Sequence, residues 1–152
     1  MAILRDLESE IELAFITYLG TSTDITGLAG TPKRWRDASS VATYPRVLVH
    51  CSPVGDAPEQ PNGDLYVANV EIGVQTDTVR DKNQAVLLQL MGAARDKLKA
   101  SGLVASLNAV AGNNVDFLER GITIGSGEHQ VDDDEVTQMS LTLTCQCTRI
   151  IA

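Results

Sequence analysis

The residue types best suited to catalysis or metal binding are scarce in this sequence. Its cysteines and histidines are Cys51, Cys145, Cys147, His50 and His129. The C-x-C spacing differs from the common zinc patterns, in which two or more residues separate the paired ligands. Two thiols that are two residues apart on a strand face the same side, where free cysteine packs as a small apolar group. We therefore expect Cys145 and Cys147 to lie in the core, and we expect the chain to be made in a reducing cytosol.

His50 and Cys51 are neighbours in RVLVHCS, a segment with the pattern of a strand. Adjacent strand residues point to opposite faces, so a Cys–His catalytic dyad is excluded. We expect His50 to be buried and hydrogen-bonded, or to lie at an interface. The sequence has neither a G-x-S-x-G frame nor a phosphate-binding glycine loop. We therefore expect a protein that is not an enzyme, with no catalytic residues, no metal and no cofactor.

The densest polar cluster is an acidic run close to His129, formed by Asp132, Asp133, Asp134 and Glu135. Carboxylates bind hard cations, but the run lacks the alternating spacing of a calcium loop. Four adjacent carboxylates in a turn point in different directions. We expect a solvated hairpin tip, with a weak cation site as the alternative.

The only basic cluster surrounds the single tryptophan: Lys33, Arg34 and Arg36 flank Trp35. Arginine and tryptophan are enriched in the hot spots of protein interfaces. We expect an interface here. A solvated loop with a packed tryptophan is the main alternative, and the cluster is too short to predict nucleic-acid binding by itself.

Hydrophobic periodicity predicts the elements that position these residues. Helices are expected at 3–19 and 79–100, with a short helical turn at 103–109. Strands are expected at 46–52 and 65–77, and a second hairpin is expected to pair a strand around 118–124 with one at 136–149. Residues 125–134 are expected to connect that hairpin. Residues 21–44 have the composition of an irregular connection with room for one short strand, and the loop 53–63 is rich in proline and glycine.

This order, α-β-β-α-β-β, predicts an α+β fold. Two helices would cover one face of a mainly antiparallel sheet of about four strands. We expect one domain over residues 1–152, with flexible segments at 21–44 and 53–63. A chain of this length buries a sizeable core without disulfides.

The strands at 65–77 and 136–149 are long, and few lysines or prolines would protect them as sheet edges. Their outward-facing residues are polar but weakly charged, among them Asn69, Gln75, Thr142 and Thr144. Such surfaces often pair with a neighbouring subunit. The pattern favours a protein that assembles over a free monomer.

Composition narrows the class of protein further. The chain has 152 residues, a net charge of −8 and 43% apolar residues, which is typical of a globular domain. The excess of acid makes general nucleic-acid wrapping a poor fit. No apolar run is long enough to span a bilayer, and the acidic N-terminal residues differ from a secretory signal, so we expect no membrane association.

The order of the predicted elements can be followed in five segments of the sequence. An amphipathic N-terminal helix, LRDLESEIELAFITYL, is followed by a YPRVLV strand. A long strand, LYVANVEIGVQTDT, then leads into a helix, NQAVLLQLMGAARDKL, and the last strand is MSLTLTCQCTRI. In this order and character the chain resembles the tail terminator (tail completion) proteins of long-tailed bacteriophages. The match covers most of the chain by order and character, without an anchoring motif.

This resemblance implies a homo-oligomeric ring, hexameric in that family, at the head-proximal end of the tail. The ring would cap the tail tube, stop its polymerisation and join the head or neck connector, after synthesis in the cytoplasm of the bacterial host. DNA would pass through its lumen without specific binding. Asp132, Asp133 and Asp134 would line that channel, and Lys33, Arg34, Trp35, Arg36, Asp56 and Glu59 would contact neighbouring components.

Three other functions stay open on the sequence alone. One is a different head–tail connector or neck protein of a phage. Another is a small metal-binding protein or enzyme that uses Asp132–Glu135, His129 and His50. The third is a regulatory domain with a ligand pocket between helices and sheet.

Overall fold

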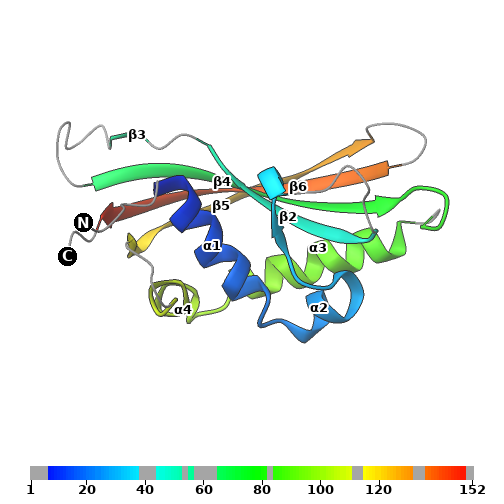
Figure 1. The fold of residues 1–152 in the computed structure, drawn as a ribbon, viewed down its shortest axis with the longest axis horizontal. Helices are drawn as coiled ribbons and strands as arrows, with labels where there is room; N and C mark the ends of the chain where they lie inside the picture. The colour runs from blue at the N-terminus through cyan, green and yellow to red at the C-terminus, as the bar shows by residue number, and fades with distance from the viewer. Residues whose placement is uncertain are drawn as a thin grey trace.

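The computed structural model shows a sheet with helices packed on one of its faces (Figure 1). The structure describes residues 7–37, 44–52, 55–56, 65–81, 84–110, 115–131 and 136–149. Their helices are α1 (Leu7–Leu19), α2 (Thr23–Ala29), α3 (Ala85–Leu98) and α4 (Leu103–Asn108), with a 3-10 turn η1 (Trp35–Asp37). Their strands are β1 (Lys33–Arg34), β2 (Arg46–Cys51), β3 (Gly55–Asp56), β4 (Leu65–Asp77), β5 (Val115–Val131) and β6 (Val136–Arg149).

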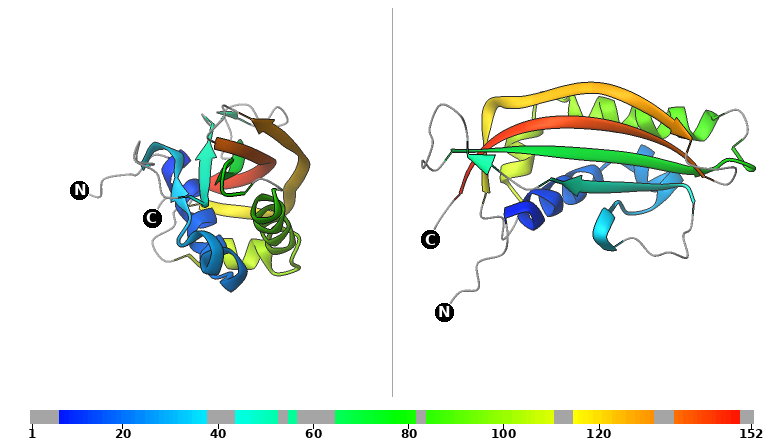
Figure 2. Two further views of the ribbon diagram at one scale, coloured as in Figure 1. Left: turned by 90° about the vertical axis from the view of Figure 1, so that its right-hand side faces the viewer. Right: turned by 90° about the horizontal axis from the view of Figure 1, so that it is seen from above.

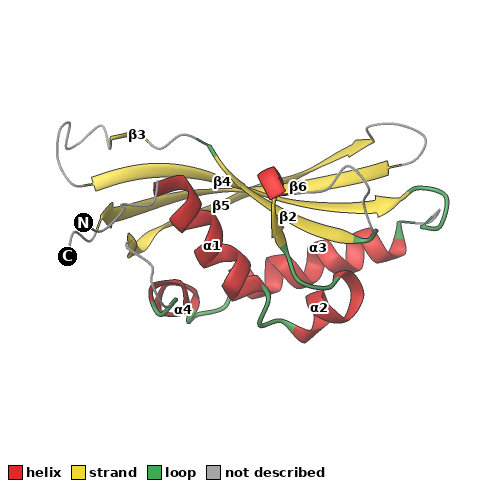
Figure 3. Ribbon diagram, in the orientation of Figure 1, coloured by secondary structure: helices red, strands yellow, loops and turns green. Residues whose placement is uncertain are grey.

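The predicted α+β class and the mainly antiparallel sheet are confirmed (Figure 3). The predicted counts differ from the structure, because the described residues form four α-helices and six strands. The additional elements are short. A two-residue strand or a seven-residue helix leaves little hydrophobic periodicity in a sequence.

The strand order is β1-β2-β4-β6-β5, and β3 pairs with β4 beside this path. Every pairing is antiparallel except that of β1 with β2. The view from above shows β5 at one margin of the sheet and β6 and β4 inside it (Figure 2). The expectation that strands 65–77 and 136–149 form edges is therefore wrong, since both are paired on two sides.

The core lies between the sheet and the helices, and it follows the alternation of the strands. On β4 the side chains of Val70, Ile72 and Val74 are fully buried, while Asn69 on the opposite face is exposed. Across the ladder, Val70 pairs with Leu143 and Ile72 with Leu141. Each such row buries two large apolar side chains, roughly 1.5–3 kcal/mol apiece, which fixes the register of the central strands.

The helix α1 contributes the largest side chains to this core. Ile11, Phe15 and Leu19 recur along one face of the helix and have no exposed surface. The ring of Phe15 meets Phe117 of β5 edge to face, with centroids 5.8 Å apart. This aromatic contact joins the first helix to the fifth strand. No helix of the described residues is long and apolar enough to cross a membrane.

The segment 21–44 is more regular than its composition predicts. Within it, α2 begins after Ser22, whose hydroxyl accepts a hydrogen bond from the backbone N–H of Ile25, and Ile25 is fully buried. Gly30 follows the helix with a φ of 71°, a left-handed conformation that glycine adopts readily. The short strand for which the sequence left room is β1.

The second hairpin also differs from its prediction, because β5 continues to Val131 and includes most of the expected connection. Its register against β6 shifts between Phe117 and Ile122 and again between Ile124 and Gly127. A β-carbon at Gly125 would lie 3.0 Å from the backbone oxygen of Thr142. Glycine thus permits the close approach at this irregularity, so what looks like turn composition is a feature of an irregular strand.

Candidate functional site

The predicted basic cluster lies at the β2 margin of the sheet. Lys33 and Arg34 form β1, which pairs with Leu48 and Val49, and Trp35 begins η1. The Nε of Arg34 donates to Asp37 over 2.7 Å, so part of the positive charge is neutralised locally. Trp35 is 47% exposed, so its ring is available for contact and is not packed into the core. The side chain of Arg36 lies outside the described part of the structure.

Most of the predicted acidic sites also lie outside the described residues. Glu59 and the run Asp132, Asp133, Asp134 and Glu135 belong to this group. The backbone of Asp56 lies in β3 and pairs with Tyr66 of β4. His129 lies in β5, and its backbone pairs with Met139 of β6. The predictions for their side chains stay predictions.

His50 lies near a carboxylate of α1. Glu12 is fully buried, and its Oε2 accepts a hydrogen bond of 2.9 Å from the backbone N–H of Cys51. The same oxygen lies 3.7 Å from Nδ1 of His50, whose side chain is 43% exposed. The imidazole is therefore half-exposed and not buried, and the alternative that His50 lies at an interface stays a prediction.

The three thiols lie on the helix side of the sheet and belong to the core, as predicted for Cys145 and Cys147. Burial raises the pKa of Cys147 to about 11, and it raises the pKa of Cys145 further, with Cys147 and Cys51 adding to the effect. These thiols hold their protons at neutral pH, so they are poor nucleophiles and poor metal ligands. Among the described residues, no group of three or more His, Cys, Asp or Glu side chains could hold a metal ion.

A row of polar side chains crosses the face of the sheet that the helices leave open. Arg46 donates through Nε to Oε1 of Gln75 over 2.7 Å, and Nε2 of Gln75 donates to Oε1 of Gln138 over 2.7 Å. Both glutamines are buried, with 4% and 7% of their surface exposed. Further along this face, Thr142 and Thr144 are exposed. The open face is thus rigid at this row and carries little charge.

Side chains and a short strand of the same chain form hydrogen bonds with much of the backbone at the sheet edges. At the β2 margin, the carboxylate of Glu12 accepts a hydrogen bond from the Cys51 N–H. The short strand β1 pairs with Leu48 and Val49. At the start of β5, the amide of Asn108 in α4 accepts from the N–H of Phe117 over 2.7 Å and donates to its carbonyl over 3.2 Å. These contacts replace a neighbouring strand, because each satisfies backbone groups that would otherwise point outward.

The second part of β5 belongs to the last strand in the order of the described sheet. From Ile122 to Val131 the strand pairs with β6 on one side, and no other backbone hydrogen bond of these residues is recorded within the described ranges. A long strand edge of this kind offers N–H and C=O groups to another chain. The sequence could not reveal this edge, because its position depends on the strand order.

A pocket of about 100 Å³ lies at the end of the sheet where β4 leads into α3. Its walls are mainly apolar and come from Tyr44, Pro45 and Val86, with Thr76 at its base. Asp77, Arg80 and Asp81 complete its lining. The carboxylate of Asp81 caps α3, accepting from the N–H groups of Val86 and Leu87 over 3.0 Å each. This cap explains why α3 begins at Ala85, later than the predicted helix start at residue 79.

A second pocket, of about 180 Å³, lies between α1, α3 and α4. The Nζ of Lys97 lies 4.8 Å from the ring centroid of Tyr18, whose hydroxyl donates to the carbonyl of Lys97. Burial raises the pKa of Tyr18, so this hydroxyl remains a donor at neutral pH. The contacts tie α1 to the end of α3.

Comparison with models of known protein families and with curated proteins found no match to this chain.

Proposed function

We propose that this protein is a tail terminator of a long-tailed bacteriophage, a structural protein that works as a ring. The ring caps the tail tube, stops its polymerisation and presents the joining surface to the head or neck connector. In this proposal the protein acts by assembling with other subunits and does not catalyse a reaction.

The open edge of β5 is the observation that supports this proposal most. Side chains or short strands cover the other stretches of edge described above, whereas the backbone of Ile122–Val131 pairs with β6 alone among the described residues. Soluble monomers usually protect long edges against pairing with other chains. A protein that assembles has a reason to keep such an edge.

The charge distribution agrees with a ring through which DNA moves. The chain carries a net charge of −8, and the open face of the sheet carries exposed threonines, while the guanidinium of Arg46 on that face is hydrogen-bonded to Gln75. Phosphates are not retained by such surfaces, because retention depends on clustered positive charge. Lys33 and Trp35, at the opposite margin of the sheet from β5, are suited to contact a neighbouring component.

The nearest alternative is another head–tail connector or neck protein of a phage, which would share the open edge and the weakly charged face. The metal-binding or ligand-binding alternative has less support. The thiols of Cys145 and Cys147 are buried and have raised pKa values, and the two pockets described above are small.

A tube-capping assay separates these possibilities. The tail tube protein encoded beside this chain would be polymerised with and without it, and tube lengths would be measured by negative-stain microscopy. A terminator shortens the tubes in proportion to its concentration and is seen at one tube end. Unchanged tube lengths and bare tube ends at every ratio would rule out the terminator function.

A further inference from the structure

The pocket between β4 and α3 contains a polar group without a partner. Thr76 is 2% exposed, and its Oγ1 has no hydrogen-bond partner among the described residues. A buried hydroxyl left in this state is unfavourable, so the site favours an occupant that accepts or donates a hydrogen bond there. The surrounding walls, from Tyr44, Pro45 and Val86, favour an aliphatic group. The preferred occupant is therefore an apolar side chain carried on a polypeptide backbone.

We infer that this pocket receives the isoleucine pair Ile150–Ile151 of a second copy of this chain. These residues directly follow β6, and they are the only adjacent isoleucines in the sequence. A pocket of about 100 Å³ suits a four-carbon side chain, since a cavity of roughly 150 Å³ holds benzene. A carbonyl oxygen of the entering segment would accept the hydrogen bond of Thr76.

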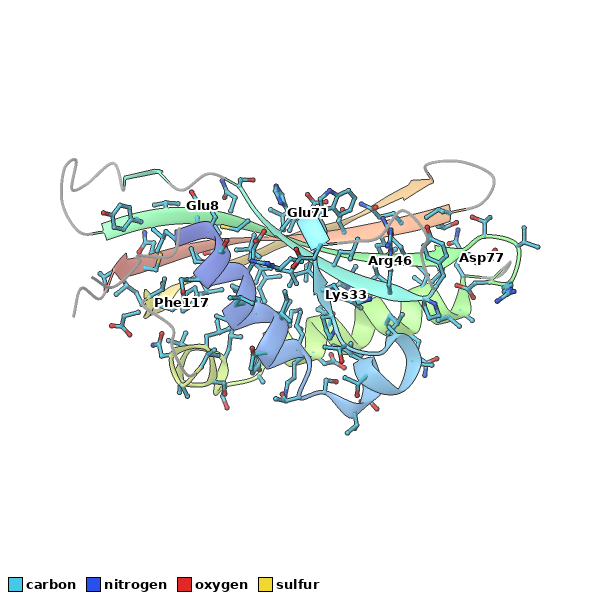
Figure 4. All side chains as sticks on the ribbon, in the orientation of Figure 1. Glu8, Lys33, Arg46, Glu71, Asp77 and Phe117 are labelled. Carbon is cyan, nitrogen blue, oxygen red and sulfur yellow. The ribbon has the colours of Figure 1, made fainter. Side chains whose placement is uncertain are left out.

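The register of the sheet shows why the occupant comes from another copy. The residue Asp77, at the pocket, pairs with Val136 at the start of β6, whereas Thr148 near the end of β6 pairs with Leu65. The two ends of β4 are about 40 Å apart at the usual rise of a strand. Ile151 is two residues beyond Arg149, a reach of about 7 Å. Figure 4 shows Asp77 and Phe117, which pairs with Cys147 near the end of β6, at opposite ends of the molecule.

Charge complementarity supports the same occupant. Among the described residues, the rim of the pocket carries Asp77 and Asp81 together with the largely exposed Arg80, whose Nε lies 3.9 Å from Oδ2 of Asp77. Both carboxylates accept backbone N–H groups and keep further lone pairs for a positive partner. Arg149 immediately precedes the isoleucine pair, so an arriving copy brings a guanidinium to this acidic rim.

Such a contact joins one end of a protomer to the opposite end of the next. Head-to-tail contacts of this kind close into rings when the rotation between copies permits. The inference thus rests on the proposed function and specifies one of its contacts between subunits. The edge of β5 is a separate surface and is not needed for it.

The first experiment compares variants of the segment and of the pocket by size-exclusion chromatography with light scattering. The double substitution I150S/I151S removes the apolar side chains, and Val86→Phe fills the pocket. Each is expected to weaken self-association at least tenfold. Ala152→Ser and Leu88→Phe are the controls: Ala152 neighbours the isoleucine pair, and Leu88 is on α3 with 54% exposure outside the pocket lining. Both should assemble as the unmodified chain does.

Mixing the two defective variants tests the direction of the contact. I150S/I151S keeps an open pocket, and V86F keeps an intact isoleucine pair. An equal mixture therefore makes a single productive contact and should give pairs of about twice the 16.3 kDa protomer mass, without rings. Rings from I150S/I151S alone would overturn the inference and leave the proposed function standing.

A peptide experiment does not depend on ring formation. A synthetic peptide of residues 146–152 would be titrated into the full chain while the methyl NMR signals of Val86 are followed. The inference expects saturable shifts that vanish when both isoleucines of the peptide are serine. Absence of peptide binding to the unmodified chain would overturn the inference. Because this test uses the unmodified chain, it remains decisive even if the Val86→Phe variant fails to fold.

Discussion

Buried polar side chains in this protein complete backbone hydrogen bonding far along the chain. Glu12 lies 39 positions before Cys51, yet its carboxylate accepts the N–H that β2 exposes beyond the end of β1. The helix pattern alone puts Glu12 outside the apolar stripe of α1. It does not show which strand edge faces this side chain. Its position three residues before Phe15 and seven before Leu19 puts it beside the buried face, and that was the available signal.

The contribution of Glu12 can be measured by equilibrium unfolding in urea. Glu12→Ala removes the carboxylate that accepts the buried Cys51 N–H, so we expect a loss of about 1–3 kcal/mol in the free energy of unfolding. Glu12→Gln keeps an acceptor oxygen and should lose less. Asp96→Ala, on the exposed side of α3, should change stability by less than about 0.5 kcal/mol. Equal losses in E12A and E12Q would contradict the assigned role.

The buried thiols predict how stability depends on pH. Burial raises the pKa of Cys147 from 9.0 to about 11, so between these values the folded chain keeps a proton that the unfolded chain releases. The free energy of unfolding therefore falls as pH rises from 9 to 11, and the stabilisation is fully present below pH 9. The unmodified chain should lose about 2 kcal/mol more than Cys147→Ala over this range. Parallel pH profiles of the two proteins would show that the thiol does not titrate in this way.

At the scale of elements, the sequence predicts those helices and strands that have a strong hydrophobic period. The strand at 65–77 has the bounds of β4, since apolar and polar residues alternate along it without interruption. α2 and β1 were missed or left open because they are too short to show a period. The second half of β5 was taken for a connection because its glycines have the composition of a turn.

Two glycines of different surroundings test this account of β5. A β-carbon at Gly125 would lie 3.0 Å from the carbonyl oxygen of Thr142, whereas one at Gly27 in α2 would meet nothing within 4 Å. Gly125→Ala should therefore destabilise the protein by about 1–3 kcal/mol through crowding. Gly27→Ala should stabilise it by about 0.5–1 kcal/mol, because alanine favours a helix interior. Thermal unfolding of both variants gives the comparison, and a neutral Gly125→Ala would refute the close approach.

At the scale of the whole molecule, the protein has two unlike margins and two unlike ends. The β2 margin is covered by β1 and Glu12 and presents Trp35, whereas the β5 margin is open from Ile122 to Val131. These asymmetries depend on strand order and register, which one sequence does not specify. Residue types alone indicate the basic cluster around Trp35, whose role as a contact surface stays a prediction, but they could not indicate the β5 edge or the Thr76 pocket.

The mass of the purified protein in solution tests the central claim most directly. Multi-angle light scattering over a wide concentration range, with negative-stain images of the same fractions, would measure it. The account predicts a closed ring of about six copies of the 16.3 kDa protomer, close to 98 kDa, at high concentration or on assembled tail tube. A monomer at every concentration, and also in the presence of assembled tube, would contradict it.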